Sequence, residues 1–266
     1  MKIGFIGTGN MGGALARAAA KGGHTLLLAN RTPAKAAVLA KELGGTVCQN
    51  AEAAETAELL FLGVKPQGLP GLAGELAPVL QARKGNAPVV VSMATAVTLR
   101  ELDAMLGGGL PLIRIMPNTP AAVGAGTILY AAQNVTDAQL DAFRAVLAQA
   151  GLLLPLPEAQ IDAASAISGC GPAFCFQFAD ALALGGVRAG LSYPDACRLA
   201  AQTMLGAAEM LLQGGEAPDV LKMRVCSPAG TTIEGVLELE QGGFSYTVQN
   251  AVTAAYRRTV EMTRKG

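Results

Sequence analysis

Short apolar runs alternate with helical patterns along the chain as far as about residue 155. Runs of this length, bounded by glycine, proline and polar residues, predict buried β-strands. Regular alternation of strands and helices is typical of an α/β domain built around a parallel sheet. The predicted strands are Lys2–Ile6, Thr25–Ala29, Leu59–Val64, Val89–Met93, Leu112–Met116, Thr127–Tyr130 and Leu152–Leu154.

Local capping signals mark where several of the intervening helices begin. Thr98 with Glu101, and Thr136 with Gln139, have the spacing of a capping box, in which each side chain bonds the other residue's backbone N–H. Thr32-Pro33 combines an N-cap residue with proline at the first helical position. These signals place helices after three of the predicted strands.

The pattern changes after Leu154-Pro-Leu-Pro157, where strand signals stop and long helical patterns begin. We place a domain boundary there, which gives an α/β domain over 1–154 and an all-helical domain over 155–266. A surface helix needs a polar face, and a helical domain of this size has little interior in which to hide apolar helices. From Ala159 to Tyr193 the charged residues are only Asp162, Asp180 and Arg188. We therefore expect a homo-oligomer, at least a dimer, in which these helices pack against a second chain; the alternative is a closely packed monomeric core.

The composition excludes several classes of protein. The 266 residues are 51% hydrophobic and 15% charged, with formal net charge +0, so nothing indicates nucleic-acid binding. No apolar run reaches membrane-spanning length, so no membrane association is expected. The start of the chain is similar to a signal peptide, but glycines interrupt its apolar core and fit a structural role better.

The cysteines and the single histidine limit the possible chemistry. Five cysteines without a Cys-x-x-Cys pair predict reduced thiols in the cytoplasm and no metal site. His24 directly precedes the strand Thr25–Ala29, whereas ligands of a parallel sheet lie beyond the carboxyl ends of its strands. His24 is therefore expected to be structural. The chain then lacks the histidine acid/base that many hydroxy-acid dehydrogenases use.

Gly7-Thr-Gly9-Asn-Met-Gly12 lies between the first strand and a helical run over 13–20. In this context the three glycines predict a Rossmann-type dinucleotide-binding domain. Gly7 allows a tight turn, Gly9 lets a pyrophosphate approach the backbone, and Gly12 permits close helix packing. The helix start supplies N–H groups and a favourable dipole for the phosphates.

Ala29-Asn-Arg-Thr32, at the end of the second strand, favours NADP over NAD. NAD enzymes usually carry a carboxylate there for the ribose 2′-hydroxyl, and a carboxylate would repel a 2′-phosphate. Arg31 instead attracts a phosphate and can bind it with two hydrogen bonds. The alternative is that Arg31 is only a solvated loop residue.

Polar residues follow three further strands, at the edge where ligands bind. Lys65-Pro66 closes one strand, and either contacts the cofactor or only terminates the strand. Ser92-Met-Ala-Thr95 follows the next strand, and a loop with two prolines, ending at Pro120, follows the one after. Arg114 alternates within an apolar strand, so we expect it to pair internally rather than to contact substrate.

Ser227-Pro-Ala-Gly-Thr-Thr232 precedes an apolar helical stretch near the C-terminus. A turn of this kind exposes several backbone N–H groups at a helix start, and these attract a carboxylate or a phosphate. The two threonine hydroxyls add neutral hydrogen-bonding groups. The alternative is an ordinary helix-capping turn.

Together these motifs resemble pyrroline-5-carboxylate reductase. The resemblance extends over essentially the whole chain and also includes Arg114-Ile-Met-Pro-Asn-Thr-Pro120 and Ser168-Gly-Cys-Gly-Pro-Ala173. It implies NADPH-dependent reduction of a cyclic imine, 1-pyrroline-5-carboxylate, to L-proline, the last step of proline biosynthesis, with NADH a possible substitute. It also implies a Rossmann domain followed by an all-helical dimerisation domain, and an active site shared between two subunits.

The resemblance also assigns site residues. Substrate carboxylate would meet the backbone of Gly230, Thr231 and Thr232, and the catalytic Thr232 hydroxyl would reach the ring nitrogen. A protonated imine is already electrophilic, so catalysis would come mainly from positioning. The resemblance assigns the cofactor to Ile6, Gly7, Thr8, Gly9, Asn10, Met11, Gly12, Asn30, Arg31, Asn50, Val64, Lys65, Pro66, Ala94 and Thr95.

Three positions depart from the family pattern. The family usually has glycine where this chain has Ala229 and serine where it has Cys170, and an uncharged residue is common at Arg224. Ala229 restricts the backbone if that position requires a positive φ. Arg224 either helps to bind the carboxylate or lies in solvent.

Two rival functions remain open at this stage. A β-hydroxyacid dehydrogenase shares the Rossmann opening and a helical second domain, but needs a lysine on the helix after the boundary. The lysines here after residue 84 are Lys222 and Lys265, and neither lies on such a helix. A non-catalytic NADP-binding regulator is the other rival. The sequence does not decide between the five-membered imine and related cyclic imines.

Overall fold

The first part of the chain forms a single eight-stranded sheet in the computed structural model, which describes residues 1–83 and 85–263. The strand order is β3-β2-β1-β4-β5-β6-β7-β8, and all neighbours are parallel except β6 and β7. The strands are β1 Lys2–Ile6, β2 Thr25–Ala29, β3 Thr46–Val47, β4 Leu59–Leu62, β5 Val89–Ser92, β6 Leu112–Pro117, β7 Gly126–Gln133 and β8 Gly151–Pro155.

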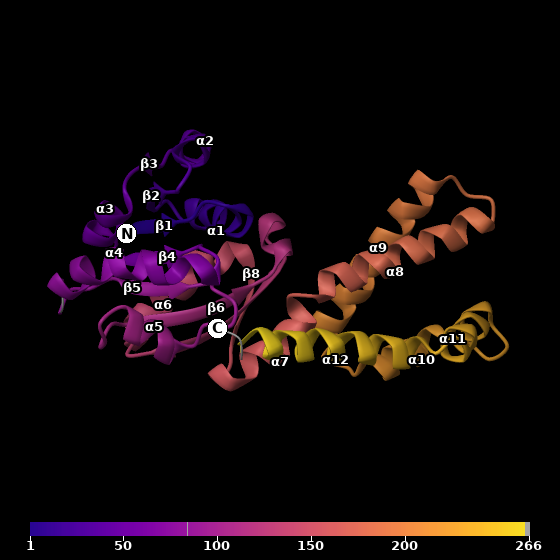
Figure 1. The fold of residues 1–266 in the computed structure, drawn as a ribbon. Coiled ribbons are helices and arrows are strands. Elements are labelled where there is room, and N and C mark those ends of the chain that lie inside the picture. The colour runs from indigo at the N-terminus through magenta and orange to yellow at the C-terminus, as the bar shows by residue number, and fades with distance from the viewer. Residues whose placement is uncertain (84, 264–266) are drawn as a thin grey trace. The chain divides into compact units, whose positions relative to one another are not determined.

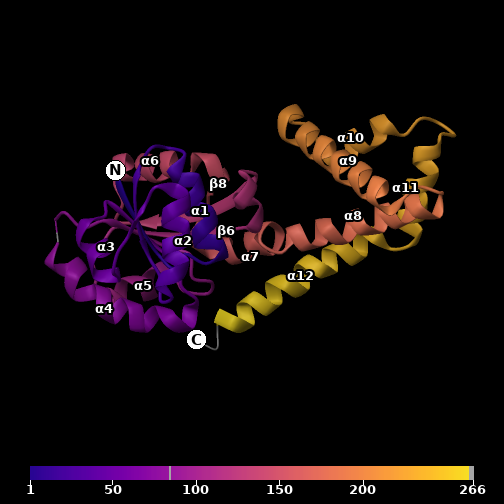
Figure 2. The ribbon, with the colours of Figure 1, turned by 90° about the horizontal axis from the view of Figure 1, so that it is seen from above.

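Helices cover both faces of this sheet (Figures 1 and 2). The α-helices are α1 Asn10–Ala20, α2 Pro33–Leu43, α3 Asn50–Thr56, α4 Leu69–Ala82, α5 Leu99–Met105, α6 Asp137–Leu147 and α7 Glu158–Ser168. Short 3-10 helices are η1 Pro66–Gly68, η2 Thr119–Val123 and η3 Ala148–Ala150.

Side chains at alternate strand positions pack into two separate hydrophobic cores, one on each face of the sheet. Phe5 and Phe61 stack with ring centroids 4.6 Å apart in the core that also receives α1, α2 and α6. Leu60 and Leu62 point to the opposite face, where they meet residues of α3, α4, α5 and α7. A sheet buried on both faces explains why its strands read as continuous apolar runs.

The structure confirms most of the predicted elements. β1 and β2 have the predicted bounds, and both capping boxes form at the starts of α5 and α6. Pro33 opens α2 as predicted, although the Thr32 side chain makes no capping hydrogen bond. The remaining predicted strands are one or more residues too long or too short, and the exposed two-residue β3 was not predicted.

The described residues after α7 form further helices. They are α8 Gly171–Arg188, α9 Tyr193–Gly214, α10 Pro218–Val225, α11 Thr231–Gln241 and α12 Phe244–Thr263. The chain divides into two compact units, 1–169 with 256–266, and 170–255. Helix α7 belongs to the first unit because it packs on β6 and β7. The limits of the functional domains, 1–154 and 155–266, stay a prediction.

The second unit buries few of its side chains. Among its described residues only Ala183, Ala196 and Ala200 are buried, whereas Phe176 is 70% exposed. By length and composition, the helical stretch Glu158–Arg188 is the one stretch in the described chain that could cross a membrane. The prediction that no apolar run reaches membrane-spanning length was therefore wrong for this stretch.

Candidate functional site

The glycine turn between β1 and α1 has the geometry of a phosphate-binding loop. Gly7 has φ +98°, and a Cβ there would lie 2.4 Å from the Gly63 carbonyl oxygen. A Cβ on Gly12 would lie 2.0 Å from the Gly7 oxygen, so both positions require glycine. A Cβ on Gly9 would have no atom within 4 Å, which leaves the approach to this backbone open.

The start of α1 presents unsatisfied donors to that open space. Gly9 is the N-cap residue and makes no side-chain cap, so the first N–H groups of the helix lack partners. No acidic residue lies in the first turn. The Thr8 hydroxyl is buried and has no hydrogen-bond partner among the described residues. Uncapped N–H groups and a buried unpaired hydroxyl fit a bound pyrophosphate.

The other predicted cofactor residues follow the carboxyl ends of neighbouring parallel strands, which meet at one edge of the sheet. Val64, Lys65 and Pro66 follow β4, and Lys65 is exposed. Ala94 and Thr95 follow β5, where the Ala94 N–H donates to Ser92 Oγ at 3.3 Å.

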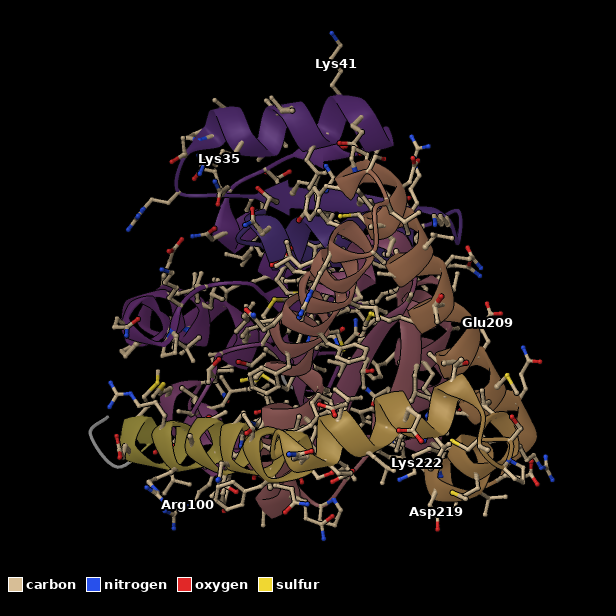
Figure 3. The ribbon with its side chains drawn as sticks, turned by 90° about the vertical axis from the view of Figure 1, so that its right-hand side faces the viewer. Lys35, Lys41, Arg100, Glu209, Asp219 and Lys222 are labelled. Carbon is tan, nitrogen blue, oxygen red and sulfur yellow. The ribbon has the colours of Figure 1, made fainter. Side chains whose placement is uncertain are left out.

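The loop after β2 carries exposed positive charge. Arg31 is exposed and forms no ion pair within the described residues, while the Asn30 side chain donates to the Thr32 carbonyl at 3.0 Å. Lys35, in the first turn of α2, adds an exposed cation that sequence reasoning missed (Figure 3). Asn50 begins α3 and donates to Glu75 Oε2 at 3.0 Å.

Strand β6 and the residue that follows it are braced from within the first unit. Arg114 is 3% exposed and pairs with Asp162 at 2.5 Å and Glu158 at 3.4 Å, as the prediction of an internal pair required. The buried Asn118 side chain donates to the Ser168 carbonyl and accepts from the Thr127 N–H, both at 2.8 Å. Sequence reasoning missed this role, because Ser168 lies 50 residues further along the chain and no local pattern links Asn118 to either partner.

The Ser227–Thr232 turn forms the start of α11 as predicted. Gly230 is the N-cap residue, no side chain caps the helix, and the Gly230 N–H donates to the Ser227 carbonyl at 3.0 Å. A Cβ on Gly230 would lie 2.3 Å from Ser227 Oγ. Ala229 has φ +55°, so the position does require the conformation that favours glycine, at a cost of about 1–2 kcal/mol.

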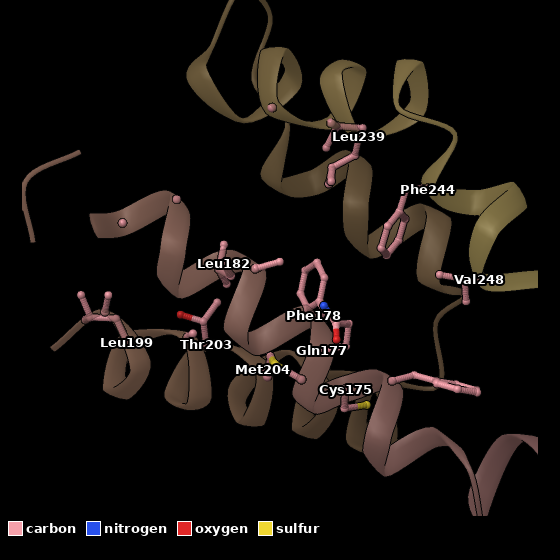
Figure 4. A pocket seen from close by; sticks show the side chains of 18 of the residues that line it. Cys175, Gln177, Phe178, Leu182, Leu199, Thr203, Met204, Leu239, Phe244 and Val248 are labelled. Atoms are coloured by element: carbon pink, nitrogen blue, oxygen red, sulfur yellow. The ribbon is translucent and has the colours of Figure 1, made fainter. Parts of the chain in front are cut away.

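Thr232 faces an open, apolar groove of about 1190 Å³ within the second unit, hereafter the apolar groove. Residues of α8, α9, α11 and α12 line it, and few of them are polar, among them Gln177 and Thr203. Phe178 of α8 and Phe244 of α12 point toward one another, with ring centroids 5.7 Å apart (Figure 4).

Two other candidates, His24 and Arg224, differ in where they lie. His24 precedes the first residue of β2, at the amino edge of the sheet, as predicted. Arg224 donates from both terminal guanidinium nitrogens to Glu216, so both nitrogens already have a partner. No group of three or more His, Cys, Asp or Glu residues that could hold a metal lies within the described part of the chain.

Comparisons with known proteins match both parts of the chain. The family described as pyrroline-5-carboxylate reductase dimerisation matches residues 158–262, and the family described as NADP oxidoreductase, coenzyme F420-dependent, matches residues 2–96. A pyrroline-5-carboxylate reductase from Synechocystis is 42% identical over 81% of this chain and 79% of its own length.

Solved structures agree over almost the full length. The Coxiella burnetii pyrroline-5-carboxylate reductase is similar with a TM-score of 0.90 and 32% identity, over 97% of each chain. The Plasmodium falciparum pyrroline carboxylate reductase, a crystal structure with NADP bound, has a TM-score of 0.86 and 30% identity over 99% of each chain.

Proposed function

We propose that the Ser227–Thr232 turn holds the substrate of this enzyme. The chain belongs to the pyrroline-5-carboxylate reductase family, and it therefore reduces 1-pyrroline-5-carboxylate to L-proline with NADPH. The observation that carries this proposal is the uncapped start of α11 beside Thr232 and the apolar groove. Backbone N–H groups there suit a carboxylate, and an apolar wall suits the methylene carbons of a five-membered ring.

The proposed role of Thr232 follows from the charge balance of the reaction. Hydride adds to the imine carbon, and the ring nitrogen must carry a proton for that carbon to be electrophilic. A neutral hydroxyl hydrogen-bonds this nitrogen without holding a competing charge. The N–H groups of the turn fix the carboxylate, and this contact orients the imine carbon.

The first unit binds the cofactor, and the proposal assigns its parts to residues. The α1 start and Thr8 hold the pyrophosphate, since these groups lack partners within the described residues. Arg31, which is exposed, holds the 2′-phosphate, and Asn30, Asn50, Val64, Lys65, Pro66, Ala94 and Thr95 line the rest. Bound NADPH supplies the hydride.

A homo-oligomer built from dimers completes the proposal. The family match over 158–262 concerns dimerisation, and the second unit exposes apolar side chains such as Phe176 and Leu184. We propose that a second copy covers these side chains, with residues 1–154 as the NADP-binding domain and 155–266 as the dimerisation and substrate domain. The five free cysteines fit a reducing cytoplasm, where we place the enzyme.

An activity measurement tests the proposal against its rivals. Purified protein should oxidise NADPH steadily with 1-pyrroline-5-carboxylate and form proline, but should not act on β-hydroxy acids with NADP. Activity on hydroxy acids would instead support a β-hydroxyacid dehydrogenase. Binding of NADPH without turnover of any cyclic imine would indicate a regulator. The six-membered homologue, assayed in parallel, measures how closely the apolar groove fits the ring.

A further inference from the structure

Arg224 and Glu216 form a two-pronged ion pair at the base of the proposed substrate turn. Both terminal nitrogens of Arg224 donate to the two carboxylate oxygens of Glu216, and the Nη2–Oε1 distance is 2.6 Å. Glu216 lies before α10 and Arg224 lies in its last turn, so the pair joins the two ends of this short helix. Paired contacts of this kind fix direction as well as distance.

Packing within a single chain leaves all of α10 at least partly exposed. None of its residues is buried, and Figure 3 labels two of its charged side chains, Asp219 and Lys222. Two adjacent glycines precede the helix, and Gly215 has φ +63°. Because glycine backbones are permissive, the link from α9 does not by itself fix the direction of α10. Within a single chain, the ion pair supplies a constraint that packing does not.

The position of α10 determines the position of the substrate turn, because the two are almost contiguous in the chain. Two residues, Val225 and Cys226, separate Arg224 from Ser227. The Cys226 N–H donates to the Met223 carbonyl at 3.1 Å, and the Gly230 N–H to Ser227 at 3.0 Å, so no long flexible segment lies between. A displaced end of α10 would therefore displace the N–H groups at the start of α11.

We propose that Arg224 is a positioning residue that acts through Glu216 to hold the Ser227–Thr232 turn in the geometry that binds the substrate carboxylate. This inference rests on the proposed function of the turn. It differs from direct binding, in which the guanidinium itself contacts the carboxylate, because Glu216 already occupies both terminal nitrogens. The two mechanisms make opposite predictions for a change at Glu216.

The test is a double-mutant cycle with Glu216→Gln, Arg224→Gln and the double variant, assayed for KM and kcat. If the pair positions the turn, each single variant raises KM for the imine about two- to fivefold, with little change in kcat or in KM for NADPH. The double variant is then no worse than the worse single one, because both changes break the same contact. Arg224→Lys, which keeps the charge but loses the fork, recovers part of the loss.

Three results would overturn the inference. Direct binding predicts that Glu216→Gln leaves KM unchanged or lowers it, by freeing Arg224, while Arg224→Gln raises it. Additive effects would mean that the residues act separately, and unchanged KM in both variants would mean that the pair is only structural.

Glu42→Gln is the matched control. It breaks the two-pronged Arg17–Glu42 pair in the first unit, whose side chains are 46% and 44% exposed. This variant should leave KM for the imine unchanged. Thr232→Ala tests the turn independently. If that variant kept full activity, the proposed function would fail whatever the cycle showed.

Discussion

Replacing Arg114 with methionine should strongly destabilise the first unit. The Arg114 side chain is 3% exposed and lies between Asp162 and Glu158, which are 21% and 28% exposed. Glu158 also accepts a hydrogen bond from the Leu99 N–H at 2.7 Å, so the network joins α5, β6 and α7. Methionine fills similar space but leaves two largely buried carboxylates without their cation.

The expected magnitude follows from the cost of an uncompensated charge. Removing one partner of a buried ion pair costs about 3–5 kcal/mol, and the partial exposure of both carboxylates favours the lower end, about 3 kcal/mol. An exposed pair contributes about 1 kcal/mol or less. Arg258→Met, which breaks the pair with Glu261, is the matched control because the two side chains are 65% and 50% exposed.

Urea unfolding followed by circular dichroism, at one fixed protein concentration, measures these free energies. The fixed concentration matters because oligomerisation contributes to apparent stability. The triple variant Arg114→Met, Glu158→Gln, Asp162→Asn should recover most of the loss, since it removes the stranded charges. The reasoning is refuted if Arg114→Met costs no more than Arg258→Met, or if the triple variant is no more stable than the single one.

Three further predictions follow from other parts of the molecule. Arg31→Ala should weaken NADPH binding by roughly 1.5–3 kcal/mol and NADH binding far less, because only NADPH offers a 2′-phosphate; equal losses in titrations with the two cofactors would contradict this role. Phe178→Asp should yield insoluble or unfolded protein, because it places a charge in the apolar groove beside Phe244, whereas sedimentation of wild-type protein as a folded, active monomer would contradict obligate assembly. Hydrogen bonds from the Thr98 backbone and hydroxyl lower the pKa of Glu101, so the stabilisation is present above the ordinary carboxyl pKa and is lost as pH falls through the lower folded value. Glu101→Gln should therefore reduce the loss of unfolding free energy at acid pH. If the free energy of unfolding fell equally with pH in both proteins, this prediction would be wrong.

Sequence reasoning worked best where a local pattern determines the outcome. Buried parallel strands read as apolar runs, so β1 and β2 were predicted with their observed bounds. Capping boxes need only four residues, and both formed. The family pattern raised the question of a positive φ at Ala229, and the backbone there has φ +55°.

What sequence reasoning missed depends on contacts between distant segments. The internal pairing of Arg114 followed from its place in an apolar strand, but its partners Asp162 and Glu158 lie on a helix beyond the predicted boundary. Asn118 braces β7 and α7 through contacts that no local pattern signals. The partner of Arg224 is nearer, but Glu216 lies before the helix that carries Arg224, at a spacing that no helical pattern signals.

Measuring kcat/KM of Thr232→Ala with 1-pyrroline-5-carboxylate tests the central assignment most directly. The variant should lose about 10- to 1000-fold, or roughly 1.4–4 kcal/mol, while NADPH binding stays almost unchanged. Thr232→Ser, which keeps the hydroxyl, should retain most of the activity, and His24→Ala should be close to wild type. Full activity in Thr232→Ala, or a folded but inactive His24→Ala, would contradict the assignment of the chemistry to this turn.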